Sequence, residues 1–142
     1  MSMTIFLAED NPADIYLLRI AFDEVDRSNV ELIVAKDGEE ALEWVRSSAI
    51  QPDSSRPDLF VLDLNLPKAD GSDILRKIRE ADQFRDIPVV VLTSSDSPRD
   101  REAAERLGAT DYLTKPTDLN AFLGLGGVLL SYAGRTGPNG AA

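Results

Sequence analysis

Short apolar runs alternate with segments of helical periodicity along most of the chain. Five runs of four to six residues are apolar, aromatic or β-branched at most positions. Because these runs are continuous rather than alternating, they predict strands of a parallel sheet that is buried on both faces. The predicted strands are residues 4–8, 30–35, 59–62, 87–92 and 111–114.

A helix is predicted after each of these strands. Asn11 caps the first helix, and apolar residues then recur at spacings of three and four, which is typical of one buried helical stripe. The stripe consists of Ile15, Leu18, Phe22 and Val25. Further helices begin near Asp37, Asp70, Ser97 and Thr117. The alternation predicts an α/β fold, a doubly wound five-stranded parallel sheet in a (βα)5, flavodoxin-like three-layer sandwich.

Residues 1–132 are predicted to form one domain, and the Gly-rich residues 133–142 a disordered tail. The last helix is the least regular part of this domain, because it contains Gly124, Gly126 and Gly127. Each glycine costs about 1 kcal/mol relative to alanine in a helix interior. Either another backbone approaches closely at these positions, or the helix frays unless a partner holds it. The sequence leaves both interpretations open.

Composition restricts the chemistry to oxygen ligands and amines. The chain has no cysteine and no histidine, which excludes disulfides, thiol catalysis, thiolate zinc sites and histidine-based catalysis. Acidic residues number 25 against 15 basic ones, and the formal net charge of −10 argues against binding to nucleic acid or anionic membranes. The densest basic group, Arg76, Lys77 and Arg79, is interpreted as a solvated helix face. Without a visible secretory signal or membrane span, we expect a cytoplasmic protein.

Polar side chains of complementary chemistry follow four of the predicted strands. Glu9 and Asp10 follow the first, Asp63 the third, Thr93 the fourth and Lys115 the fifth. In a parallel α/β sheet, the carboxyl ends of the strands lie at one edge of the sheet, and ligands bind at that edge. Taken singly, Asp10 is explained as a helix-capping residue and Asp63 as a turn residue. Taken together, these carboxylates would repel one another, and a bound cation would relieve the repulsion. An all-oxygen site suits Mg²⁺, and a nearby lysine ammonium can neutralise the charge of a phosphate group. The residues therefore predict a Mg²⁺ site that handles phosphate.

Four motifs in this chain resemble the receiver domain of two-component response regulators. They are residues 6–11, residues 61–67 with Asp70 and Gly71, residues 91–94 and residues 108–116. The resemblance covers about residues 4–132, which is essentially the whole predicted domain. It implies a phosphoacceptor switch that catalyses only its own phosphotransfer from phosphohistidine and its own dephosphorylation, and that is otherwise not an enzyme.

The resemblance also implies a role for each acidic site residue. Asp63 corresponds to the phosphoacceptor. Glu9 and Asp10 correspond to the acidic pair that positions Mg²⁺, and Asp63 and the backbone carbonyl of Asn65 would complete the protein ligands.

The resemblance implies roles for four further residues, three of them in stabilising the phosphoryl group and in switching. Thr93 matches the switch hydroxyl, Lys115 the ammonium that pairs with the phosphoryl group, and Tyr112 the aromatic switch position. A cis peptide bond before Pro116 would aim Lys115 into the site. After phosphorylation, Thr93 is drawn in and Tyr112 rotates into the vacated space. The face formed by the fourth helix, the fifth strand and the last helix then changes its preferred packing.

The expected partners are a sensor histidine kinase and a downstream protein effector. Residues 9–14, 35–42 and 64–68 are most similar to the small stand-alone regulators associated with phytochrome-type histidine kinases. The face formed by the fourth helix, the fifth strand and the last helix is expected to bind the effector, or a second copy of the chain in a homodimer. The sequence does not distinguish a diffusing effector from a phosphorelay intermediate or a phosphate sink.

Two other functions share parts of this pattern. A phosphatase of the haloacid dehalogenase type also phosphorylates a strand-end aspartate, but it needs an acidic residue two positions later, where this chain has Asn65. A flavodoxin-like cofactor-binding protein shares the fold class, but Glu9 and Asp10 would repel a cofactor phosphate after the first strand. Both alternatives therefore rank behind the receiver interpretation.

Overall fold

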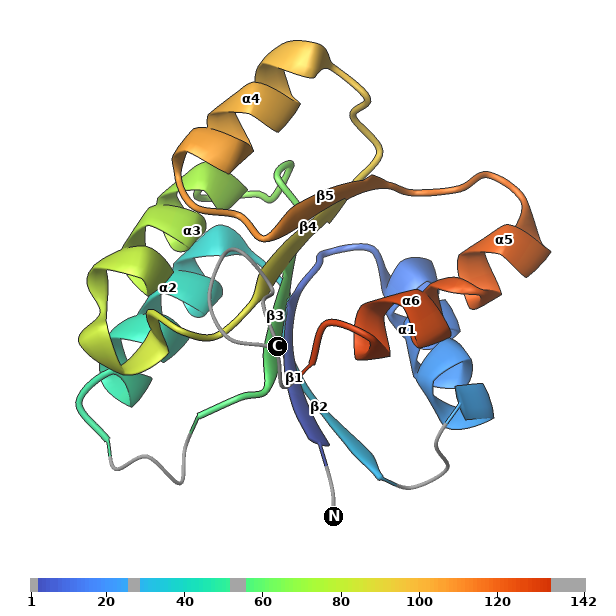
Figure 1. Ribbon diagram of the computed structural model, residues 1–142, viewed down its shortest axis with the longest axis horizontal. Coiled ribbons are helices and arrows are strands. Elements are labelled where there is room, and N and C mark those ends of the chain that lie inside the picture. The colour runs from blue at the N-terminus through green and yellow to red at the C-terminus, as the bar shows by residue number, and fades with distance from the viewer. Residues whose placement is uncertain (1–2, 26–28, 52–55, 134–142) are drawn as a thin grey trace.

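The computed structural model describes residues 3–25, 29–51 and 56–133, and its centre is a sheet of parallel strands. The described strands pair in the order β2-β1-β3-β4-β5, which confirms the predicted fold class (Figure 1). The order places β3 in the middle and reverses the winding direction beside β1, as expected for a doubly wound sheet. The strands are β1 (Met3–Ala8), β2 (Val30–Ala35), β3 (Leu59–Leu62), β4 (Val89–Thr93) and β5 (Asp111–Thr114).

Helices cover both faces of the sheet (Figure 1). One layer contains α1 (Pro12–Val25), α5 (Leu119–Leu123) and α6 (Leu125–Leu130), and the other contains α2 (Gly38–Ser48), α3 (Gly71–Glu80) and α4 (Pro98–Arg106). A short 3-10 helix, η2 (Asp82–Phe84), was not predicted. The predicted last helix is divided into α5 and α6 at Gly124.

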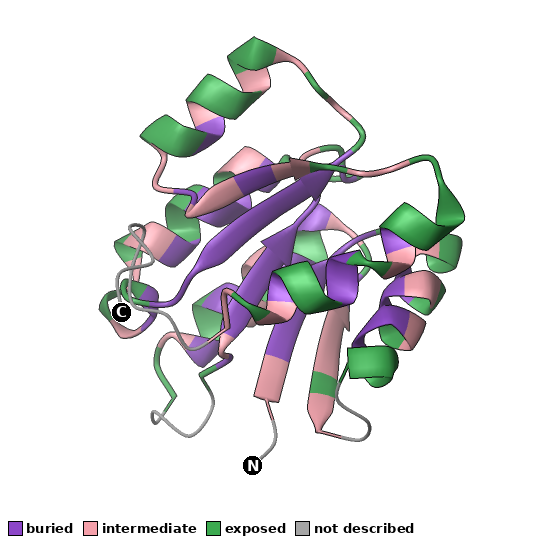
Figure 2. Cartoon of the chain, turned by 45° about the vertical axis from the view of Figure 1, so that its right-hand side comes forward, coloured by how far each residue is buried: buried purple, intermediate pink, exposed green. Residues whose placement is uncertain are grey.

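Each face of the sheet has its own apolar core. Alternate residues of β1 point to opposite layers, so that Phe6 packs with α2 and α3 while Ile5 packs with α1 and α6. The middle strands β3 and β4 are buried along their whole length, whereas the helices are buried mainly on the side that faces the sheet (Figure 2). Val25 is an exception to the predicted stripe of α1, because its side chain is exposed.

The close approach of α6 to α1 explains one of the glycines. A Cβ atom at Gly126 would lie 2.3 Å from the carbonyl oxygen of Ala21. At Gly127 it would meet only the Val25 side chain, at 4.0 Å. Of the two interpretations left open by the sequence, close backbone contact is therefore correct for Gly126.

Short polar residues begin the helices as predicted. The Asn11 side chain accepts hydrogen bonds from the backbone N–H groups of Ala13 and Asp14, at 2.9 and 3.3 Å. The Asp37 and Ser97 side chains cap α2 and α4 in the same way. These caps fix the direction in which each helix leaves the carboxyl edge of the sheet.

The basic group formed by Arg76, Lys77 and Arg79 was predicted to be a solvated helix face. For Arg79 this prediction is wrong. Its guanidinium is partly buried and donates to the carbonyl oxygens of Gly108 at 2.8 Å and Ile87 at 2.8 Å, and also to those of Phe84 and Arg85. Burial lowers the pKa of this guanidinium. Arg79 therefore ties the end of α3 to the loops before β4 and β5.

No helix in the described residues is long and apolar enough to cross a membrane. The predicted tail, residues 133–142, lies outside the described residues except for its first position.

Candidate functional site

The carboxyl ends of β1, β3, β4 and β5 bring the predicted side chains together. The ammonium of Lys115 lies 2.7 Å from Glu9 Oε1 and 2.9 Å from Asp63 Oδ2. Glu9 is 1% exposed and Asp63 6% exposed, so these two charges are almost completely removed from water. The parallel topology accounts for this convergence, because each residue follows a strand that ends at the same edge.

A third carboxylate, which was not among the predicted site residues, also binds Lys115. Asp14 Oδ2 accepts a hydrogen bond from Lys115 Nζ at 2.9 Å. Asp14 belongs to the first turn of α1, where an acidic residue is explained by helix-terminus electrostatics alone. No local pattern in the sequence indicated this contact, because its partner Lys115 lies 101 residues later in the chain.

Three carboxylates form a group that suits a divalent cation. Glu9, Asp10 and Asp63 each offer one oxygen, and these oxygens all lie within 4.8 Å of one another. Asp10 is exposed, which leaves the group open to solvent on one side. Asn65, the fourth predicted ligand, lies beside it, and its backbone N–H donates to Asp63 Oδ1 at 3.0 Å. An all-oxygen donor set of this kind fits a hard cation.

The electrostatics of the group also favour a cation. Burial raises the pKa of Glu9, against the lowering effect of the hydrogen bond from Lys115. Burial alone would lower the pKa of Lys115, but its hydrogen bonds to Glu9, Asp14 and Asp63 outweigh this effect and raise it. The single positive charge of Lys115 is smaller than the combined negative charge of the carboxylates around it. A divalent cation would balance the remaining negative charge.

The Thr93 hydroxyl lies in the same region and is completely buried. Its oxygen accepts from the Asn65 side-chain amide at 3.5 Å and from the backbone N–H of Ser95 at 3.4 Å. Both distances are long for hydrogen bonds, so these contacts hold the hydroxyl weakly.

Tyr112 is buried with its ring under α4. Its hydroxyl donates to the backbone carbonyl of Ser95 at 2.7 Å. The guanidinium of Arg101 lies 4.7 Å from the centre of the ring and donates to the carbonyl of Tyr112 at 3.2 Å. The aromatic side chain thus links β5 to α4 and to the loop that follows β4.

The predicted cis peptide bond before Pro116 is wrong. The described part of the chain contains no cis peptide bond, so the bond between Lys115 and Pro116 is trans. Trans is favoured before proline by about 0.5–1 kcal/mol. Lys115 reaches the carboxylates without the cis bond, because its backbone N–H donates to the Thr93 carbonyl at 2.7 Å and continues the pairing of β5 with β4.

A cavity of about 410 Å³ opens beside Lys115. Asp14 on α1, Thr117 and Asp118 before α5, and Phe122 in α5 contribute to its walls. The cavity therefore gives access to the ammonium from the side of α1 and α5.

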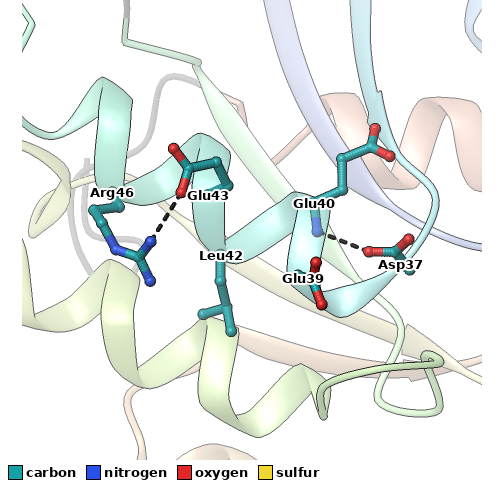
Figure 3. Close-up of a pocket in the computed structure, with 6 residues that line it drawn as sticks. All are labelled: Asp37, Glu39, Glu40, Leu42, Glu43 and Arg46. Carbon is teal, nitrogen blue, oxygen red and sulfur yellow. Dashed lines mark hydrogen bonds and ion pairs between the residues drawn. The ribbon is translucent and has the colours of Figure 1, made fainter.

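A second pocket, of about 380 Å³, is lined only by residues at and near α2 and includes none of the strand-end residues (Figure 3). The charged side chains of Asp37, Glu43 and Arg46 in this pocket already have partners. Glu43 pairs with Arg46 at 2.8 Å, and Asp37 accepts from the backbone N–H of Glu40 at 2.7 Å (Figure 3). We therefore assign the chemistry to the strand-end site.

Comparisons with known proteins agree with this assignment. The family model described as the response regulator receiver domain matches residues 5–124. Response regulator Rcp1 of Synechocystis is 38% identical over 115 residues, which are 81% of this chain and 78% of Rcp1.

Solved structures are similar over most of the chain. The phosphorylated cyanobacterial phytochrome response regulator RcpA superimposes with a TM-score of 0.83 and 36% identity, and covers 94% of this chain and 97% of its own. The Mn²⁺-bound form of Rcp1 has a TM-score of 0.78 and 35% identity, covering 89% of this chain and 91% of its own. The structure of a metal-bound relative and the group of Glu9, Asp10 and Asp63 agree on a divalent-metal site. This chain belongs to the response regulator receiver domain family, and it is a phosphoacceptor switch of two-component signalling rather than a conventional enzyme.

Proposed function

We propose that Asp63 receives a phosphoryl group from a histidine kinase, with Mg²⁺ as the cation of the site. The observation that carries this proposal is the position of the Asp63 carboxylate. Its Oδ2 lies 2.9 Å from the Lys115 ammonium, and the same carboxylate belongs to the group formed with Glu9 and Asp10. A nucleophilic carboxylate beside an ammonium and a cation site is suited to phosphoryl transfer.

The transfer forms one bond and breaks another. A carboxylate oxygen of Asp63 attacks the phosphorus of a phosphohistidine, and the bond from phosphorus to the imidazole nitrogen breaks. The imidazole nitrogen leaves with the bonding electron pair. Lys115 neutralises charge on the transferred group. Hydrolysis of the acyl phosphate by water later releases inorganic phosphate and restores the carboxylate.

Glu9, Asp10, Asp63 and the backbone carbonyl of Asn65 would hold Mg²⁺. The ion supplies positive charge that offsets the negative charge of the phosphoryl oxygens and of the buried carboxylates. Lys115 then supplies the second positive charge, from the side of the cavity.

Thr93 and Tyr112 would convert phosphorylation into a change at the surface. The long contacts of the Thr93 hydroxyl leave it free to turn toward a phosphoryl oxygen. Because the Tyr112 ring is already buried, phosphorylation stabilises this arrangement rather than creating it. The arrangement connects Tyr112 to Arg101, so the face formed by α4, β5 and α5 is the surface whose packing responds.

The partners follow from the family and its relatives. RcpA, at 36% identity, is described as a phytochrome response regulator, which supports a phytochrome-type histidine kinase as phosphoryl donor for this chain. The face formed by α4, β5 and α5 would bind a downstream protein effector or a second copy of the chain. A role as phosphorelay intermediate or phosphate sink uses the same chemistry at Asp63 and differs only in what receives the signal.

The experiment incubates the purified protein with Mg²⁺ and acetyl phosphate and measures its intact mass. We expect an increase of one phosphoryl group, which disappears with Asp63→Asn or with EDTA. Asp73→Asn, an exposed aspartate on α3, serves as the matched control and should be phosphorylated like the wild type. Phosphorylation of the Asp63→Asn variant would contradict the proposal. Steady release of phosphate from a phosphomonoester would instead favour the phosphatase alternative.

A further inference from the structure

The ammonium of Lys115 uses all three of its hydrogens on carboxylates. Its nitrogen lies 2.7 Å from Glu9 Oε1 and 2.9 Å from both Asp14 Oδ2 and Asp63 Oδ2. An ammonium has three donors, so each carboxylate takes one. The Lys115 side chain is 9% exposed and that of Asp14 18% exposed, so their ion pair is largely shielded from solvent.

Asp14 differs from the other two partners in what else it does. Glu9 and Asp63 belong to the group that suits a divalent cation, and Asp14 does not. A cation bound by Glu9 and Asp63 would neutralise these carboxylates and repel the ammonium. Of the three carboxylates on Lys115, only that of Asp14 would then remain fully available to it.

Asp14 is also held more firmly than the lysine it binds. It lies in the first turn of α1, where its backbone N–H donates to the capping side chain of Asn11 at 3.3 Å. Lysine, by contrast, carries its charge on a flexible four-carbon stem. A short side chain on a fixed helix is therefore able to restrict where the ammonium goes.

We propose that Asp14 is a positioning residue that keeps the Lys115 ammonium within reach of the phosphoryl group during transfer to Asp63. This inference rests on the proposed function of Asp63. Asp14 touches neither the phosphoryl group nor the cation in this proposal. It acts only through Lys115, and its effect is on the transfer step rather than on the binding of the phosphodonor.

The test compares Asp14→Asn, Asp14→Glu and Asp118→Asn in phosphorylation by acetyl phosphate at saturating Mg²⁺. Asp118 is the matched control, because it lines the same cavity and caps α5, and asparagine preserves the cap. We expect Asp14→Asn to lower the maximal rate roughly 10-fold to 100-fold, as misplaced catalytic groups do. The acetyl phosphate concentration at half-maximal rate should change less than about threefold. Asp14→Glu should recover most of the rate, and Asp118→Asn should match the wild type.

A double-mutant cycle separates positioning from loss of a nearby charge. In a Lys115→Met background, Asp14→Asn should cause no further decrease in rate, because the side chain that it positions is absent. An equal decrease in both backgrounds would overturn the inference. An unchanged maximal rate in the single variant Asp14→Asn, or the same decrease in Asp118→Asn, would overturn it as well.

A measurement without metal or phosphodonor provides an independent check. Hydrogen exchange of the Lys115 ammonium with water, followed by NMR in the metal-free protein, should be several-fold faster in Asp14→Asn than in the wild type and Asp118→Asn. Equal exchange in all three proteins would contradict the inference. If the wild type takes up no phosphoryl group, the proposed function fails. If the wild type is phosphorylated and Asp14→Asn is phosphorylated equally fast, only the role of Asp14 fails.

Discussion

The hydroxyl of Tyr112 donates a hydrogen bond to the backbone carbonyl of Ser95 at 2.7 Å, which connects β5 to the loop that follows β4. The same loop is closed by the Ser95 hydroxyl, which donates to Asp100 in α4 at 2.6 Å. The guanidinium of Arg101 lies over the face of the Tyr112 ring. Tyr112, in the edge strand β5, is therefore a structural junction between β5, α4 and the loop that follows β4, as well as the proposed switch residue.

Tyr112→Phe should destabilise the fold by about 0.5–1.5 kcal/mol, because it removes the hydrogen bond and leaves the Ser95 carbonyl without this partner. The free energy of unfolding in urea measures this effect. Tyr16→Phe is the matched control, since Tyr16 is 65% exposed, and it should change stability by less than about 0.5 kcal/mol. Equal effects of the two substitutions would contradict the importance of the junction.

Two neighbouring glycines of α6 should respond to alanine with opposite signs. Gly126→Ala places a Cβ 2.3 Å from the Ala21 carbonyl oxygen, so α6 must move away from α1 and the protein should lose stability, by about 1–3 kcal/mol. Gly127→Ala meets only Val25, at 4.0 Å, and should gain up to about 1 kcal/mol of helix propensity. Urea unfolding of both variants tests this. Destabilisation of equal size at both positions would be inconsistent with the packing of α6 on α1.

Arg79→Met should cost about 2–4 kcal/mol, because the guanidinium bonds to four backbone carbonyls that would lose a charged donor. Arg76→Met is the matched control, because Arg76 belongs to the same helix, α3. Arg76 forms an exposed ion pair with Asp73, and the loss of this pair should cost less than about 0.5 kcal/mol. Thermal unfolding of the two variants side by side measures the difference. A similar melting temperature for both would refute the structural role of Arg79.

The free energy of unfolding should depend on pH because of the Asp37 carboxylate at the start of α2. The hydrogen bond from the backbone N–H of Glu40 lowers the pKa of Asp37 below its usual value of 3.8, and Lys68 acts in the same direction. Because the folded pKa is depressed, the contribution is present above pH 3.8 and is lost as the pH falls through the folded pKa. Asp37→Asn keeps a capping side chain but does not titrate. Urea midpoints of wild type and variant should therefore converge as the pH is lowered from 6 toward 3, and a constant difference would argue against this linkage.

Much of the site could be predicted because it depends on strand ends. Glu9, Asp63, Thr93 and Lys115 each follow an apolar run, and parallel strands deliver their carboxyl ends to one edge. Asp14 was missed because its partner comes from another element, and its place in a first helical turn already had a sufficient explanation. Arg79 was misinterpreted for a related reason, since a basic group along a helix does not indicate which member turns inward.

The sequence by itself determined the alternation of strands and helices, the helix cap at Asn11, the helix starts near Asp37 and Ser97, and the edge at which Glu9 and Asp63 meet. These features follow from local periodicity and from the topology of parallel sheets, which short stretches of chain encode. Only the tertiary structure decided that Asp14 reaches Lys115, 101 residues later in the chain. It also decided that α6 packs against the backbone of α1. Such contacts depend on how closely two packed elements approach, and that distance arises from the three-dimensional packing of the core rather than from any local pattern.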